Sequence, residues 1–310
     1  MMSILVVGSA NIDYTLNVDR LPAAGETVTA EKFAQMIGGK GVNQAVAAAR
    51  AGGSVAMVCC IGSDSNGQRL RAALETEGIV VDHVSVAPAP SGVAVVMTAA
   101  GGDNMIAVAP GANAMLQPSM LNADQFAGKS IVLCQLEISL EATLQASRLA
   151  RASGTIFILD PAPARTMPRE LLARVGWLTP NESEARSLLD LPYGEFDPVS
   201  AARGIRAMGV SNVIIKLGGG GSLLLCKDGD PIFIAPHDVA AIDTTAAGDS
   251  FNGAFAVALS EGARPENAAR FASAASALAV TRCGACDAMP YRTEIKQLFS
   301  LDTLAAMTIR

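Results

Sequence analysis

The chain has 310 residues, 50% of them hydrophobic and 17% charged, and it carries a formal net charge of −6. This acidic balance argues against a surface for nucleic acids or anionic membranes, because such surfaces need a dense basic patch. No apolar run approaches the roughly 18 residues of a membrane span and the first residues lack the basic region of a secretory signal, so we expect a cytoplasmic protein with no nucleic-acid or membrane partner.

Short runs rich in valine and isoleucine alternate along the chain with segments of helical periodicity. The clearest strands are predicted at residues 4–7, 55–61, 131–136, 155–160 and 213–217. The clearest helices are predicted at residues 42–51, 139–152, 198–208, 248–261 and 265–280. This alternation is typical of a mainly parallel sheet covered by helices, and no linker or repeat divides it. We therefore predict an α/β fold formed by one domain over residues 1–310.

Two stretches interrupt the alternation, at residues 14–33 and 92–109. In the second stretch a Gly-rich turn separates two β-prone runs, which predicts a hairpin. We expect the two stretches to form a small antiparallel sheet set apart from the main one, suited to act as a lid that expels water from a reaction site. An edge hairpin with no moving part is the alternative.

Polar residues gather near the N-terminus, where a ligand crevice is expected. Asn11 and Asp13 follow the first predicted strand, and Gly39, Lys40 and Asn43 stand at the start of the first predicted helix. Polar side chains at the carboxyl ends of parallel strands point into the ligand crevice of an open α/β sheet, and Asn and Asp offer partners for vicinal hydroxyls. Neither segment has the glycine spacing of a dinucleotide or Walker loop. Tight turns are the alternative interpretation.

The six cysteines are predicted to be reduced and structural, because most lie in apolar, strand-like runs. They are Cys59, Cys60, Cys134, Cys226, Cys283 and Cys286. The last two form a Cys-x-x-Cys, but no second pair or nearby histidine completes a zinc site.

Residues 243–255 combine small side chains with the start of an apolar helix. Small residues let an anion approach the backbone, and the free amides of a helix N-terminus carry partial positive charge. Ala246, Ala247 and Gly248 are therefore candidates for an anion hole, and Asp249 is the candidate general base beside it. An ordinary N-terminal cap is the alternative role for Asp249.

Four segments resemble the PfkB carbohydrate kinases, in the order expected of that family. They are residues 38–48, 160–165, 179–185 and 243–253, and the resemblance extends from Val6 almost to Phe299. It implies a Rossmann-like fold with a small β-sheet lid that often contributes to a homodimer. It also implies ATP-dependent phosphorylation of a sugar hydroxyl, most closely that of D-ribose to D-ribose 5-phosphate.

The resemblance also assigns residues to the site. Substrate contacts fall on Asn11, Asp13, Gly39, Lys40, Asn43, Glu137 and Asp249, with Asp249 as the catalytic base. Nucleotide contacts fall on Asn181, Glu184, Lys216, Gly218, Gly219, Gly221, Gly248 and Ser273, and Glu184 helps to hold Mg²⁺ through water. A monovalent cation, K⁺, is expected at Asp243, Thr245, Ala279, Arg282, Gly284 and Ala288.

The chain departs from the family pattern at four places, one of which is Gly219-Gly220, where a serine with a long polar or basic neighbour is more typical. Lys216 stands where threonine is common, Ser273 where histidine occurs, and Ala288 where serine is frequent. Lys216 is predicted to reach a phosphate, and a solvated lysine at a strand end is the alternative. The lack of a serine hydroxyl at position 288 is expected to weaken cation binding.

Composition favours a small neutral sugar as the substrate. Aromatic residues make up only 4% of the chain, whereas a nucleoside kinase needs a sandwich for the base. Residues 92–109 contain no Lys or Arg, although a sugar-phosphate kinase needs basic groups near its lid. Another small sugar, a nucleoside, or a catalytically silent sugar or nucleotide sensor remain the alternatives.

Overall fold

The computed structural model describes residues 3–101 and 103–308, which form two sheets of different size. The larger sheet has the strand order β13-β12-β11-β10-β9-β8-β1-β4-β5. Its strands are β1 (Ser3–Val7), β4 (Ser54–Gly62), β5 (Val80–Ala87), β8 (Lys129–Cys134), β9 (Ile156–Leu159), β10 (Trp177–Leu178), β11 (Asn212–Lys216), β12 (Ser222–Leu225) and β13 (Ile232–Ile234). All neighbouring strands from β5 to β11 are parallel, and β12 and β13 continue the sheet antiparallel.

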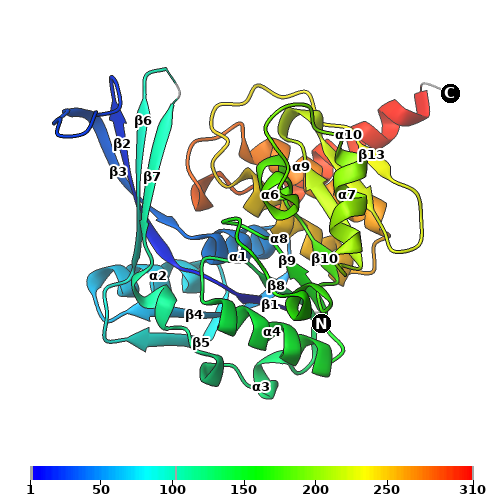
Figure 1. Ribbon diagram of the computed structural model, residues 1–310, viewed down its shortest axis with the longest axis horizontal. Coiled ribbons are helices and arrows are strands. Elements are labelled where there is room, and N and C mark those ends of the chain that lie inside the picture. The colour runs from blue at the N-terminus through cyan, green and yellow to red at the C-terminus, as the bar shows by residue number, and fades with distance from the viewer. Residues whose placement is uncertain (1–2, 102, 309–310) are drawn as a thin grey trace.

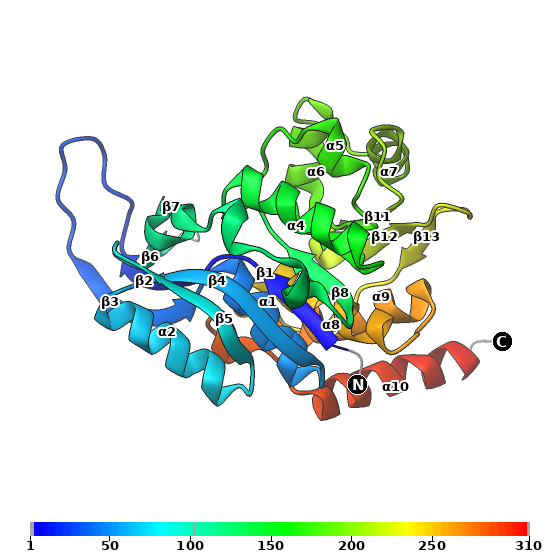
Figure 2. The same cartoon turned by 90° about the horizontal axis from the view of Figure 1, so that it is seen from below.

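Helices cover both faces of the large sheet, as Figure 2 shows. One layer contains α1 (Lys40–Arg50), α2 (Ser65–Thr76), α8 (Ala247–Ser260), α9 (Pro265–Ala279) and α10 (Arg292–Thr308). The other contains α3 (Ala123–Phe126), α4 (Leu140–Ala152), α5 (Arg169–Leu172), α6 (Glu182–Leu189) and α7 (Pro198–Ala207). Side chains alternate across a strand, so Ile4 and Val6 of β1 pack into the first layer while Leu5 and Val7 pack into the second.

The small sheet projects to one side of the helical layers (Figure 1). Its strand order is β3-β2-β6-β7, formed by β2 (Asn11–Val18), β3 (Ala30–Gly38), β6 (Gly92–Ala99) and β7 (Asn104–Ala109). Strands β6 and β7 pair antiparallel, so the predicted hairpin is confirmed. Strands β2 and β6 pair parallel, however, so the sheet is mixed rather than purely antiparallel. It also reaches beyond the predicted segment 14–33, because β2 begins at Asn11 and β3 ends at Gly38.

The predicted α/β class and the mainly parallel sheet are confirmed. Each of the five predicted strands and five predicted helices overlaps an observed element. Strands β5 and β13 were not among the clearest patterns, because they lie at the edges of the sheet and carry exposed positions, whereas β10 and β12 were missed because they have only two and four residues. No helix within residues 3–101 and 103–308 is long and apolar enough to cross a membrane.

Candidate active site

The close approach of α1 and α8 creates the centre of the site. Gly253 lies at the crossing, where an added Cβ would be 2.6 Å from the Cβ of Ala47 and 2.7 Å from the backbone nitrogen of Ala48. Only a residue without a side chain lets the two helices meet this closely. As a result, the first turns of α1 and α8 present their polar side chains to each other.

Asp249 lies in the first turn of α8 and is buried, with 4% of its surface exposed. Its Oδ2 accepts a hydrogen bond of 3.0 Å from Asn43 Nδ2, and its Oδ1 accepts one of 2.9 Å from Gln44 Nε2. The N-cap position belongs to Ala246, so Asp249 is not an ordinary cap. Burial raises the pKa of Asp249, while the charge of Lys40 and the two amide donors oppose that rise.

The segment before α8 has an unusual backbone. Ala246 adopts φ 57° and ψ 13°, a left-handed conformation that costs a non-glycine residue roughly 1–2 kcal/mol. The hydroxyl of Ser276 donates a 3.0 Å hydrogen bond to the carbonyl oxygen of Ala247 and so fixes the next peptide. Amides in a first helical turn have no acceptor inside the helix. The Ala247 amide already donates a 3.3 Å hydrogen bond to Thr244 O. The segment therefore holds the amides of this turn in a fixed arrangement that suits an anion.

A cavity of about 490 Å³ opens beside this turn. Its wall includes all four predicted catalytic residues, Ala246, Ala247, Gly248 and Asp249. It also includes all the predicted nucleotide contacts, namely Asn181, Glu184, Lys216, Gly218, Gly219, Gly221, Gly248 and Ser273. The lining also includes the apolar residues Pro236, Val239, Ala241, Ala277 and Val280. The cavity thus combines apolar and polar groups in its lining.

Asn181 and Glu184 form a reciprocal cap at the start of α6. Asn181 Oδ1 accepts a 2.8 Å hydrogen bond from the Glu184 amide, and Glu184 Oε2 accepts a 2.8 Å bond from the Asn181 amide. Asn181 therefore caps α6, and both residues also line the cavity. Burial and the nearby Asp160 carboxylate raise the pKa of Glu184, and Lys216 opposes the rise.

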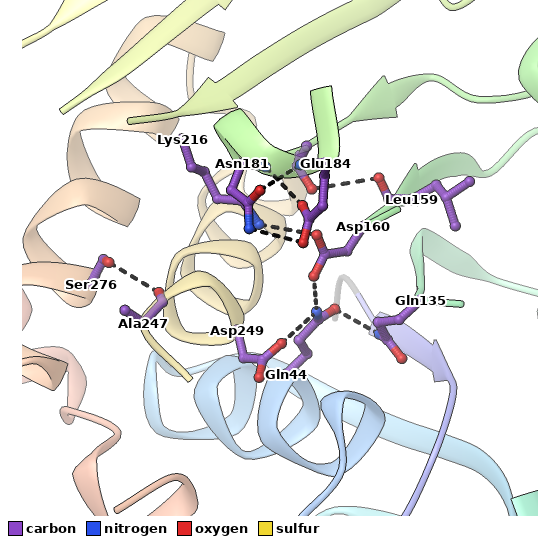
Figure 3. A network of polar contacts seen from close by, with 11 residues as sticks. Gln44, Gln135, Leu159, Asp160, Asn181, Glu184, Lys216, Ala247, Asp249 and Ser276 are labelled. Carbon is purple, nitrogen blue, oxygen red and sulfur yellow. Dashed lines mark hydrogen bonds and ion pairs between the residues drawn. The ribbon is translucent and has the colours of Figure 1, made fainter. Parts of the chain in front are cut away.

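Lys216, at the end of β11, points into the cavity instead of standing in solvent. Its Nζ forms a 3.0 Å ion pair with Asp160 Oδ1, and the side chain is 13% exposed. Asp160 Oδ2 accepts a 2.9 Å hydrogen bond from Gln44 Nε2, the same nitrogen that bonds Asp249. Figure 3 shows this continuous network, which Gln135 extends with a 2.6 Å bond to Gln44 Oε1.

Of the predicted sugar contacts, Lys40 and Asp249 line the cavity, and Asn11 and Asp13 lie on β2 of the small sheet. Asn43 bonds Asp249 directly, and Glu137 Oε2 accepts from the amide of Lys40 at 3.0 Å. Gly39 precedes α1 in a left-handed conformation, φ 87°, with its backbone against Asn11.

Asn11 and Asp13 differ in whether their side-chain oxygens have hydrogen-bond partners. Asn11 Oδ1 accepts a 2.7 Å hydrogen bond from Asn113 Nδ2. Asp13 Oδ1 is buried and has no hydrogen-bond partner among the described residues. Burial, together with the charges of Glu137 and Asp249, raises the pKa of Asp13 to about 7. Asp13 is thus an acceptor whose ionisation changes near neutral pH.

Hydrogen bonds connect only some of the residues that are predicted to surround a monovalent cation. Asp243 accepts 2.9 Å hydrogen bonds from the amides of Thr245 and Gly284, linking the two loops. The carbonyl of Ala279 accepts from the Arg282 amide, and the Arg282 guanidinium pairs with Glu294. Ala288 is buried in the short helical turn Cys286–Ala288. Burial would raise the pKa of Asp243, but hydrogen bonds involving Thr245 and Gly284 outweigh it and lower the pKa.

The sequence patterns assign no role to four residues that the structure places in these networks. Gln44 and Asp160 lie within segments that resemble the kinase family, so a signal for them exists in residues 38–48 and 160–165. Asn113 and Gln135 lie outside those segments, and only their contacts in the folded chain reveal them.

Comparisons with known proteins agree with this geometry. A family profile described as "pfkB family carbohydrate kinase" matches residues 1–292. A ribokinase of Haemophilus influenzae is 39% identical over 296 residues, covering 94% of this chain and 96% of that protein. A ribokinase structure from Thermotoga maritima has a TM-score of 0.89 at 40% identity, covering 97% of this chain and 100% of that one. An Arabidopsis thaliana ribokinase, complexed with ribose and ATP, has a TM-score of 0.89 at 36% identity, covering 96% and 99%.

Proposed function

This chain belongs to the pfkB family of carbohydrate kinases, and on that premise we propose that it uses ATP to convert D-ribose to D-ribose 5-phosphate. The observation that carries the proposal is the buried Asp249 in the first turn of α8, at the wall of the cavity. A general base and an anion-binding backbone within one helical turn suit phosphoryl transfer to a hydroxyl. A silent sensor has no need of such a base.

In the proposed reaction the sugar hydroxyl oxygen forms a bond to the γ-phosphorus while the bond to the bridging oxygen of ADP breaks. ADP leaves with that electron pair, and Asp249 accepts the hydroxyl proton. Asn43 and Gln44 hold opposite oxygens of the Asp249 carboxylate, which fixes its plane. The amides of residues 246–248 stabilise the charge on the phosphate during transfer.

The charges of the cavity wall support Mg²⁺ as the cofactor of this reaction. Three carboxylates, of Asp160, Glu184 and Asp249, face two ammonium groups, of Lys40 and Lys216. The phosphates of ATP would therefore enter a surface that already carries excess negative charge. Mg²⁺ commonly binds through one or two carboxylates, waters and phosphates. We assign it to Glu184 through water, where the bound ion would neutralise phosphate charge.

The loops joined by Asp243 support the assignment of K⁺. A carboxylate whose pKa is lowered, and which joins two loops by accepting from their amides, favours a cation nearby. The proposed ligands are Asp243, Thr245, Ala279, Arg282, Gly284 and Ala288, mainly through backbone oxygens. A cation there would fix the peptide dipoles that lead into α8.

Two observations favour ribose as the sugar: the relatives named above, and the polar side chains beside Asp249. Asn11, Asp13, Asn43 and Glu137 offer donors and acceptors for hydroxyl groups beside Asp249. The described part of the lid hairpin, β6 and β7, carries no basic residue for a second phosphate. A free pentose therefore fits this chemistry better than a sugar phosphate.

The lid also supports a homodimer. All six residues of β7 are exposed, including Met105, Ile106 and Val108 at 52%, 61% and 51%. Phe33 on β3 is 60% exposed, so apolar side chains occur on both edge strands of the small sheet. An exposed apolar sheet edge invites pairing with another chain. We propose that two copies associate through their lids.

A coupled ADP-release assay over a sugar panel tests the proposed function. The panel contains D-ribose, 2-deoxyribose, fructose, fructose 6-phosphate, ribose 5-phosphate and adenosine, each with saturating Mg²⁺ and ATP. We expect the highest specificity constant for ribose and no release of ADP with ribose 5-phosphate. A much higher specificity constant for a nucleoside or a sugar phosphate would overturn the substrate assignment.

A further inference from the structure

We infer that Asp160 is a positioning residue that holds the Lys216 ammonium against the first turn of α8, where it binds the terminal phosphate of the nucleotide. The inference rests on the proposed kinase function and adds two roles to it. Lys216 supplies a charge at the anion hole. Asp160 determines where that charge lies.

The position of Lys216 shows why an anion belongs beside it. A Cβ built on Gly248 would lie 3.1 Å from Lys216 Nζ, so the ammonium packs against the N-terminal turn of α8. A helix N-terminus carries partial positive charge, and a cation next to it is unfavourable unless an anion is shared. A phosphate at this place would be shared by the ammonium and the amides of the first helical turn.

Asp160 is the group that keeps Lys216 there. Their ion pair measures 3.0 Å, and the Asp160 side chain is 3% exposed, so the carboxylate is too buried to be left unpaired cheaply. The backbone of Lys216 is fixed as well, since its amide donates a 2.9 Å hydrogen bond to Pro180 O beside the Asn181 cap. The side chain thus starts from a rigid strand end and is directed by one carboxylate.

Gln44 fixes the carboxylate of Asp160 in turn. The Gln44 amide nitrogen has two hydrogens, and it donates one to Asp160 Oδ2 and one to Asp249 Oδ1, each at 2.9 Å. The Gln44 oxygen accepts from Gln135, so a flipped amide would place an oxygen against two carboxylates. Figure 3 shows the resulting order Lys216, Asp160, Gln44, Asp249. The phosphate-binding charge and the base are therefore held in one frame.

A double-mutant cycle of Asp160→Asn and Lys216→Met tests this inference by nucleotide binding. The probes are Mg·AMP-PNP, which has a γ-phosphate group, and Mg·ADP, which lacks one, each titrated calorimetrically. Lys216→Met should weaken AMP-PNP binding about tenfold to a hundredfold, the range for one charge-assisted hydrogen bond, with a smaller loss for ADP. Asp160→Asn should weaken AMP-PNP binding about tenfold, because Lys216 loses its anchor.

The double variant distinguishes a shared role from two separate ones. If Asp160 acts by holding Lys216, its substitution in the Lys216→Met background should change AMP-PNP affinity less than about threefold. Losses that multiply, or an unchanged affinity in Asp160→Asn, would overturn the inference. Lys216→Met alone leaves a buried carboxylate unpaired and can unfold. The double variant removes that charge too. Comparing its AMP-PNP affinity with that of Asp160→Asn therefore still tests whether Lys216 binds phosphate only when Asp160 holds it.

Turnover against pH supplies a readout that a purely structural role would not move. Asp160 contributes to the raised pKa of Asp249, so Asp160→Asn should shift the acid limb of kcat to lower pH. The groups that face or act electrostatically on Asp249 are Asp13 on β2, Lys40, Asn43 and Gln44 on α1, Asp160 after β9, and Cys286 in the loop before α10. An acid limb that stays in place or moves to higher pH would contradict the electrostatic coupling between Asp160 and Asp249.

Glu77→Gln is the matched control for these variants. Glu77 and Arg50 form a partly buried ion pair, with side chains 19% and 12% exposed, and neither lines the cavity. This variant should lose stability without losing AMP-PNP affinity. If the wild-type chain released no ADP with any sugar, the proposed function would fail, whereas the binding cycle would still decide the role of Asp160.

Discussion

The two sides of Asp249 are built in different ways. On the nucleotide side, a cavity of about 490 Å³ is lined by glycine-rich turns of the large sheet and by the N-termini of helices that cover this sheet. On the sugar side, side chains from the small sheet meet α1, and Asp13 keeps a buried oxygen without a partner among the described residues. In the proposed function, backbone groups on the scaffold of the large sheet bind the phosphates. Side chains on the small sheet contact the sugar in that proposal.

Asp249→Asn is expected to have the largest effect, because Asp249 serves both sides. Asparagine keeps the size of the side chain but cannot accept the hydroxyl proton, so kcat should fall at least about a hundredfold. Binding of ribose and of Mg·ADP should survive, which calorimetry measures. Near-normal turnover in a variant verified by mass would remove Asp249 as the base.

Asp13→Asn tests the sugar side alone. The pKa of Asp13 is raised to about 7, so the carboxylate becomes protonated, and loses an acceptor, as the pH falls below that value. Ribose affinity should then weaken towards tenfold per pH unit if the charged form is required. Calorimetric titrations with ribose and no nucleotide, at steps of about half a pH unit from about 5.5 to about 8.5, measure this affinity. The charges that act on Asp13 are those of Glu137, Asp249 and Lys40.

Asp13→Asn should bind ribose more weakly at high pH and lose most of that pH dependence. Binding of Mg·ADP by the same variant should not change, since Asp13 does not line the nucleotide cavity. An unaltered pH dependence in the variant would assign the titration to another group.

Potassium tests the loop that supports the nucleotide side. Replacing Na⁺ by K⁺ at constant ionic strength should raise kcat by about threefold or more, because the bound ion orients the amides before α8. Ala288→Ser adds a hydroxyl oxygen and should lower the K⁺ concentration needed for half of the effect. A flat titration with saturating Mg²⁺, ATP and ribose would exclude functional coupling to this site.

Ile106→Asp is expected to have the smallest effect on catalysis, since Ile106 lies on the outer lid strand. A charge in an apolar interface should weaken the dimer at least about tenfold, as sedimentation equilibrium would measure. Phe233→Asp is the control, because Phe233 is 57% exposed on β13, away from the lid. Equal association of both variants and the wild-type chain would place any dimer interface elsewhere.

The sequence predicts the nucleotide side more completely than the sugar side for a physical reason. Small residues at the start of α8 indicate a phosphate site at Gly248 by local chemistry, the family resemblance assigns Gly218 and Asn181, and all three lie in one wall. Asn11 and Asp13 were expected at a strand end of the main sheet, but they lie on β2 of the small sheet. Their neighbours depend on how two sheets meet, which local patterns do not encode.

The network behind Asp249 shows the same limit. Gln44 lies in a recognisable segment, yet nothing local indicates that its amide bridges residues 116 and 205 positions away. Lys216 could be read either as a phosphate ligand or as a solvated lysine, and only its ion pair with Asp160 excludes the second reading. Long-range contacts of this kind follow from the packing of α1, α8 and β11 together.

The most direct test of the account identifies the atom that receives the phosphate. The chain is incubated with Mg²⁺, ATP and D-ribose, the product is analysed by ³¹P NMR, and 5-deoxyribose serves as the matched control that lacks the accepting hydroxyl. The account predicts a single phosphomonoester at C5 of ribose, with stoichiometric ADP, and no product from 5-deoxyribose. A phosphate at another carbon, or ADP released equally with 5-deoxyribose, would contradict it.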